Sequence, residues 1–90
     1  MVVVDKENYE ELSRLKWQCR RGVLELDMLL IPFLSEAYPK LSEKEKATFV
    51  ALLASSDETL LSWFFGDARP DTEDLHQMVL KVLSNRSSSI

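Results

Sequence analysis

The chain has 90 residues, 46% of them hydrophobic and 29% charged, with a formal net charge of −4. This length fits one compact domain, and the negative charge argues against non-specific binding to nucleic acid. The single cysteine excludes an internal disulfide and suits a reducing compartment. The N-terminus lacks a secretory signal pattern, and the longest apolar stretch, residues 28–34, is too short to cross a bilayer. We therefore expect a soluble cytoplasmic domain.

The first predicted helix covers residues 8–21. With only two glycines and three prolines, the chain favours helices over many short strands. Leu12, Leu15 and Cys19 form an apolar stripe at helical spacing, which predicts that Cys19 is a small buried hydrophobe. Trp17 falls off this stripe. For Trp17 we favour a second contact with the body of the domain over a place on a partner-facing surface.

The second predicted helix, residues 23–38, contains the most apolar run of the chain. Its apolar residues have the spacing of a core-facing helix, at Leu26, Leu29, Leu30, Phe33, Leu34 and Ala37. Pro32 removes a hydrogen bond inside the helix and predicts a kink, and Pro39 ends the helix. We expect this helix at the centre of the domain. Its most buried residues should be Leu29, Leu30, Phe33 and Leu34.

Three further helices are predicted after residue 41. Ser42 and Glu45 have the spacing of a capping box at the start of the third helix. Asp57 is the expected N-cap of a short fourth helix, and Gly66 marks its end. Residues 72–85 match the amphipathic pattern of a fifth helix.

These segments predict an all-α fold, a single compact bundle of about five helices. The chain has no internal repeat and no sign of a second domain. We assign residues 1–86 to the helical domain. The serine-rich residues 87–90 should form a disordered C-terminal tail.

Residues 20–27 stand out because two arginines run directly into a glycine, with two carboxylates close behind. Cationic residues followed by a left-handed glycine are typical of a helix end, which makes this stretch a corner between two helices. Alternatively, Arg21, Gly22 and Glu25 form a docking patch in which the missing side chain lets a partner approach. Arg21 and Glu25 could also pair on a continuous helix, but an exposed pair in this order stabilises a helix very little.

The run Arg-Gly-x-x-Glu, preceded by Trp-x-Cys-Arg and followed by Leu-Asp and an apolar helix, resembles the succinate dehydrogenase assembly factor family. The resemblance extends from about Leu15 to about Arg86. It implies a small helical protein that binds the flavoprotein subunit of succinate dehydrogenase or fumarate reductase and assists covalent attachment of FAD. FAD then belongs to the client, and we expect no stably bound cofactor in this chain. We expect a monomer that neither binds nucleic acid nor inserts into a membrane.

The family's partner-binding residues carry over to Arg21, Gly22 and Glu25, which match the signature directly. Asp27 matches the acidic residue that commonly follows. Further along, Trp63, Arg69 and Pro70 fit a second family pattern of tryptophan, glycine, a basic residue and proline. There Ala68 stands at the glycine position and Gly66 comes two residues early, which leaves the shape of this loop open.

Little in the sequence indicates catalysis. Cys19 and His76 are the only cysteine and histidine and lie far apart in sequence, so a metal site is poorly supported. Acidic clusters fall at predicted helix starts, where they complement the helix dipole. We therefore predict that the protein is not an enzyme. The alternatives are an antitoxin-type or other interaction module of a toxin–antitoxin pair, a label also attached to this family, and a small enzyme or metal carrier.

The resemblance implies that the flavoprotein supplies the reacting groups. A helper can then act by favouring the client conformation that holds FAD and a client histidine in near-attack geometry. To do so it must bind that conformation more tightly than the others. For this role we expect Arg21 and Glu25 to be solvent-accessible on one surface with Gly22. Alanine at Arg21 or Glu25 should weaken client flavinylation and leave the fold largely intact.

Overall fold

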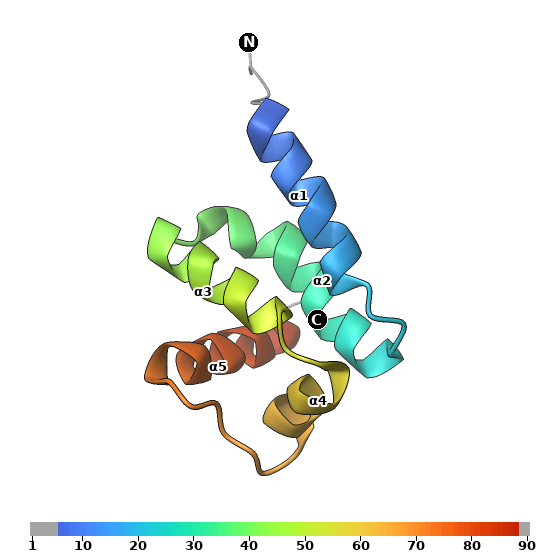
Figure 1. Cartoon of the computed structure of the whole chain (residues 1–90), viewed down its shortest axis with the longest axis vertical. Coiled ribbons are helices and arrows are strands. Elements are labelled where there is room, and N and C mark those ends of the chain that lie inside the picture. Colours follow the sequence, from blue (N-terminus) through green and yellow to red (C-terminus); the bar gives the residue numbers. More distant parts are fainter. Residues whose placement is uncertain (1–5, 89–90) are drawn as a thin grey trace.

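The computed structural model describes the backbone of residues 6–88 and the side chains of residues 10–85. Within that range the chain forms helices and connecting turns, with no strand. The elements in order are α1 (Lys6–Cys19), α2 (Leu24–Glu36), the 3-10 helix η1 (Tyr38–Lys40), α3 (Glu43–Leu53), α4 (Asp57–Phe65) and α5 (Glu73–Ser88). The predicted all-α bundle of five helices is confirmed (Figure 1).

Helix α2 lies at the centre of the bundle, where it packs against α1, α4 and α5 (Figure 1). Its predicted core residues are all buried, at Leu29, Leu30, Phe33 and Leu34. Burying each such side chain stabilises the fold by roughly 1.5–3 kcal/mol. The helix continues through Pro32 and ends at Glu36, two residues before the predicted end, because Pro39 belongs to η1.

An aromatic cluster joins α2, η1 and α3 inside the bundle. The ring centroids of Phe33 and Phe49 are 5.1 Å apart, and those of Tyr38 and Phe49 are 5.6 Å apart. Tilted pairs at these distances stabilise the core beyond their buried area. The cluster therefore fixes the 3-10 turn to the helices on either side of it.

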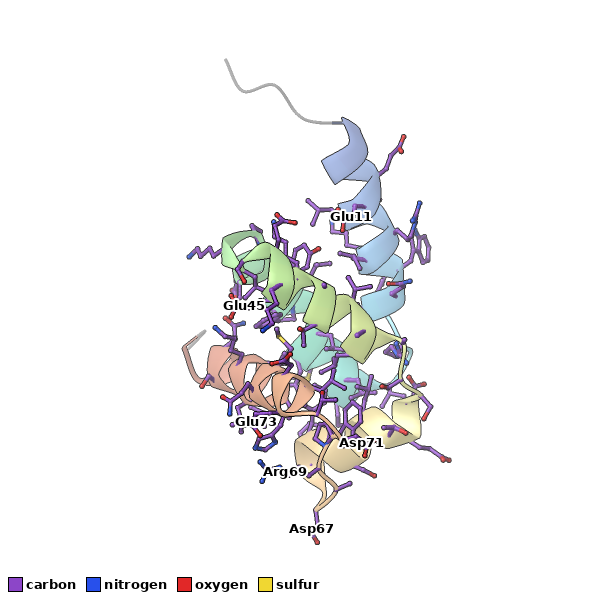
Figure 2. The ribbon with its side chains drawn as sticks, turned by 60° about the vertical axis from the view of Figure 1, so that its left-hand side comes forward. Glu11, Glu45, Asp67, Arg69, Asp71 and Glu73 are labelled. Carbon is purple, nitrogen blue, oxygen red and sulfur yellow. The ribbon has the colours of Figure 1, made fainter. Side chains whose placement is uncertain are left out.

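Helix α3 begins with the predicted capping box. The Glu45 N–H donates to Ser42 Oγ at 3.1 Å, and the Ser42 N–H donates to Glu45 Oε1 at 3.0 Å. Glu45 also pairs with Lys81 Nζ at 2.9 Å, which ties α3 to α5 (Figure 2). Hydrogen bonds from Lys81 and from the Ser42 N–H lower the pKa of the Glu45 carboxyl to about 2.

The cap of α4 differs from the prediction. Ser56, not Asp57, is the N-cap, and its hydroxyl accepts from the Thr59 N–H at 3.2 Å. Ser56 has an extended backbone and stands outside the first turn, whereas Asp57 is already the first helical residue. The Asp57 carboxylate is therefore free for a contact with another part of the chain.

The last helix is longer than predicted. Helix α5 begins at Glu73 and runs to Ser88, three residues beyond the predicted end at Asn85. It thus includes the first two residues of the predicted tail, and residues 89–90 lie outside the described part of the chain. Among residues 6–88, the helices lack the combination of length and hydrophobicity that a membrane span requires.

Candidate functional site

The signature residues lie at the corner between α1 and α2, residues 20–23. The corner turns at Gly22, whose φ of +79° lies in the left-handed region, so the predicted left-handed glycine between the two helices is confirmed. Gly22 does not itself close α1, because α1 runs from Lys6 to Cys19 and not over the predicted residues 8–21. A Cβ added to Gly22 would meet no atom of the described residues within 4 Å. The backbone conformation, rather than crowding inside the chain, therefore requires glycine here. The space above it is open to a partner.

The Arg21 side chain turns inward from this corner and joins three helices. Its Nε donates to Asp57 Oδ1 at 2.6 Å, at the first residue of α4. Its Nη1 donates to the carbonyl of Leu53, the last residue of α3, at 2.8 Å, and more weakly to the Gln18 carbonyl of α1 at 3.3 Å. Its Nη2 donates to the Ser55 carbonyl in the α3–α4 turn. Arg21 thereby satisfies carbonyls that the end of α3 leaves without helical partners.

The prediction that Arg21 is solvent-accessible is therefore wrong. Only 14% of its side chain is exposed. The alternative pairing of Arg21 with Glu25 is not what forms either, because Arg21 lies in the corner outside both helices and its ion pair is with Asp57. Because α1 ends at Cys19 and the chain turns at Gly22, Arg21 and Glu25 do not share one helix. The guanidinium instead donates hydrogen bonds to Leu53, Ser55 and Asp57, which lie 32 to 36 positions further along the chain.

Asp27 also forms a hydrogen bond within the corner. Its Oδ1 accepts the Arg21 backbone N–H at 2.8 Å, and the residue is half-buried. This bond joins the corner to the first turn of α2, across a sequence separation of six residues. Asp27 thus fixes the direction in which the chain enters α2. The sequence spacing gave no indication of this role.

Glu25 and Gly22 are exposed, as predicted. Glu25 lies in the first turn of α2, where its negative charge complements the positive end of the helix. The signature therefore divides into two pairs. Arg21 and Asp27 face the interior and shape the corner, while Gly22 and Glu25 face solvent.

Trp17 lies on the outer side of α1 and is 74% exposed. The predicted second contact with the body of the domain is wrong. Leu15 and Cys19 are both buried, and a residue midway between them points roughly away from that stripe. On α2, Leu24 and Met28 are 68% and 65% exposed. The outer faces of both helices that form the corner thus carry large uncovered apolar side chains.

Cys19 is the last residue of α1 and is completely buried, as predicted. Burial raises the pKa of its thiol to about 12, and the nearby Arg21 guanidinium only partly opposes this shift. A thiol with so high a pKa is protonated at neutral pH and is a poor nucleophile. Cys19 therefore serves packing at the end of α1.

The rest of the described surface offers little for chemistry. Among the described residues, no group of three or more His, Cys, Asp or Glu is placed to hold a metal ion. Figure 2 shows Glu11 on α1 and Glu45 on α3 far from Asp67 and Asp71 in the α4–α5 loop. A groove of about 400 Å³ between α1 and α3 contains Tyr38, whose hydroxyl donates to Glu11 at 3.3 Å. Burial and this carboxylate raise the pKa of Tyr38 to about 12.

Comparison with known proteins shows that the chain is similar to one family over most of its length. The family model described as "Flavinator of succinate dehydrogenase" matches residues 13–86. The chain is 49% identical over 78 residues to the "FAD assembly factor SdhE" of Mannheimia succiniciproducens, which covers 87% of this chain and 90% of that protein. It is 42% identical to the protein of the same name from Vibrio cholerae, over 90% of this chain and 94% of that protein. The Pseudomonas aeruginosa protein of that name is 45% identical, over 81% of this chain and 87% of its own length.

Proposed function

The chain belongs to the family of flavinators of succinate dehydrogenase, and on this premise we propose that it is a non-catalytic assembly factor. It binds the flavoprotein subunit of succinate dehydrogenase and promotes covalent attachment of FAD to that subunit. The flavoprotein subunit of fumarate reductase is a second client, and FAD is attached to it in the same way. The chain acts as a monomer in the cytoplasm, and FAD remains the client's cofactor.

The observation that carries this proposal is the braced corner between α1 and α2. Gly22 and Glu25 are exposed there, while Arg21 and Asp27 hold the backbone from within. A surface that is already rigid loses little conformational entropy on binding. We therefore assign client contact to Gly22 and Glu25. Arg21 and Asp27 support that contact by fixing the shape of the corner.

This arrangement accounts for assistance without catalytic groups. Covalent flavinylation joins a client histidine to the FAD ring, and its rate depends on how often the two are held in near-attack geometry. A rigid surface that binds the competent client conformation more tightly raises the population of that conformation. A tenfold preference raises the ratio of competent to other conformations by about tenfold. The flavoprotein then carries out the chemistry with its own groups.

The test uses purified chain, apo flavoprotein subunit and FAD, with in-gel flavin fluorescence to follow covalent attachment. Glu25→Gln should slow attachment by about tenfold or more, as expected for a charged residue at the centre of an interface. Glu58→Gln is the matched control, because Glu25 and Glu58 are both exposed and both second residues of their helices, α2 and α4.

Thermal unfolding of both variants accompanies the assay. Because each glutamate is exposed in a first helical turn, both substitutions should change the melting temperature to the same small extent. Equal flavin attachment by the Glu25 and Glu58 variants would show that Glu25 does not contact the client. Failure of the unmodified chain to accelerate attachment would reject the proposed function itself.

A further inference from the structure

A shallow groove runs between the outer sides of α1 and α2, next to the braced corner. It has a volume of about 400 Å³ and is lined by Ser13, Lys16, Trp17, Arg20 and Ile31. From Ile31, the exposed side chains of Met28 and Leu24 continue along the same face of α2, at positions three and seven residues earlier. This apolar strip leads toward the start of α2, where Gly22 and Glu25 are exposed.

The strip combines several large, uncovered apolar side chains. Trp17, Leu24 and Met28 are each about two-thirds exposed or more. Contiguous apolar surface of this kind is typical of interaction sites rather than of surface that stays in water. Tryptophan and arginine are also the residues most often found at the energetic centre of protein interfaces.

The charge around the groove is opposite to that of the chain as a whole. The chain has 15 acidic and 11 basic residues, giving a net charge of −4. The described residues that line the groove nevertheless carry two positive charges, Lys16 and Arg20, and no carboxylate. Such a local reversal of sign favours a partner with an acidic surface.

We propose that this strip, from Trp17 and Arg20 across Ile31 to Met28 and Leu24, is a second part of the docking surface. It binds a segment of the client flavoprotein subunit that presents an apolar side chain flanked by carboxylates. The proposal rests on the proposed function, because it takes the flavoprotein as the occupant. Continuity with the exposed corner and charge complementarity at Lys16 and Arg20 argue for that occupant.

The groove test measures binding of the full chain to the apo flavoprotein subunit by calorimetry. Trp17→Ser and Met28→Ser should each weaken binding by about tenfold or more. Phe65→Ser and Leu80→Ser are matched controls, because these exposed apolar residues lie on α4 and α5. The control variants should bind within about twofold of the unmodified chain, a change of about 0.4 kcal/mol.

A second arm tests the charge. Arg20→Glu should weaken binding, and the loss should shrink as salt is added, because salt screens charges exposed at the rim of an interface. Lys44→Glu, at an exposed position on α3, is the matched charge reversal and should leave binding unchanged. Arg20→Glu binding as tightly as the unmodified chain would remove the acidic partner segment from the proposal.

The outcomes separate the two proposals. If Glu25→Gln weakens binding while Trp17→Ser and Met28→Ser do not, the strip is not part of the interface and the proposed function stands. If the unmodified chain neither binds the flavoprotein nor accelerates flavin attachment, the proposed function fails. If sedimentation shows a dimer of this chain that Trp17→Ser dissociates, a second copy covers the strip and the inference is overturned.

Discussion

The corner between α1 and α2 and the loop between α4 and α5 are built from similar residues and are held in opposite ways. Each has an arginine and a glycine close together, with an acidic partner for the arginine. The side chain of Arg21 is 14% exposed and joins three helices, whereas that of Arg69 is 64% exposed and pairs with Glu73, the first residue of α5 (Figure 2). The same residue type is an internal brace in one connector and a surface charge in the other.

The two glycines differ as well. Gly22 has a left-handed backbone and open space where a side chain would lie. Gly66 has an extended backbone that any residue can adopt, but a Cβ there would lie 3.0 Å from the Ser62 carbonyl oxygen. Conformation therefore selects glycine in the corner, and crowding selects it in the loop. The comparison shows that an Arg–Gly pair has no fixed structural meaning until its long-range partners are known.

The largest difference between the connectors should appear when each arginine is replaced by methionine. Arg21→Met leaves the Leu53 and Ser55 carbonyls without their donor and should lower the free energy of unfolding by about 2–3 kcal/mol. Arg69→Met removes an exposed pair and should cost less than about 1 kcal/mol. Urea unfolding of both variants measures the difference. Equal losses would mean that the two connectors contribute alike to stability.

This expectation corrects the view that Arg21 could be removed without harm to the fold. If Arg21→Met loses flavin attachment, the loss has two sources, the changed shape of the corner and any client contact that Arg21 itself makes. Glu25→Gln is the cleaner test of docking, because Glu25 is exposed.

A smaller effect should distinguish the reasons for the two glycines. Gly22→Ala forces a side chain into the left-handed region and should destabilise the fold by about 1–2 kcal/mol. Gly22→Asn should cost roughly half as much, because asparagine tolerates this conformation. At Gly66, asparagine should be no better than alanine, since the obstacle there is the Ser62 carbonyl. Thermal melts of the four variants measure the pattern, and an advantage for asparagine at Gly66 would contradict it.

The smallest effect concerns the protonation of Glu73, the first residue of α5, which pairs with Arg69 of the α4–α5 loop. Hydrogen bonds from Gln77 and then Arg69 lower the pKa of the Glu73 carboxyl below its ordinary value of 4.5. A lowered folded-state pKa means that the contribution of Glu73 to stability is present above pH 4.5 and is lost as the pH falls below it. In an NMR titration, Arg69→Met should raise the pKa of Glu73 partway toward 4.5. Gln77→Ala should raise this pKa by more than Arg69→Met does, because the Gln77 hydrogen bond lowers it most. Identical midpoints in all three proteins would show that neither partner acts on Glu73.

Local patterns were enough to predict most of the fold. The apolar spacing of α2 identified the central helix and its buried residues, and the Ser42–Glu45 spacing identified the cap of α3. The N-cap of α4 was misplaced by one residue because Ser56 and Asp57 are both good caps in sequence. The structure uses Asp57 to bind Arg21, a contact between residues 36 positions apart.

The candidate site was predictable in position but not in orientation. The glycine signal located the corner correctly, since it depends only on neighbouring residues. The inward turn of Arg21 depends on the end of α3 and the start of α4 lying beside the corner in space, which no local pattern encodes. The exposure of Trp17 was missed for a related reason. Falling off one apolar stripe does not say whether another helix covers the opposite side, and in this bundle none of the described helices buries it.

The placement of the two tryptophans has an optical consequence. Trp17 stands in water on the outer side of α1, whereas Trp63 is half-buried against the core from α4. An indole in water emits at longer wavelength than one packed among apolar side chains, so the two contribute different bands to the intrinsic fluorescence. Unfolding should shift the emission of Trp63 to the red, and covering the α1–α2 face should shift that of Trp17 to the blue. Trp63 fluorescence therefore reports on the packing of the fold, and Trp17 fluorescence reports on binding of a partner to the α1–α2 face.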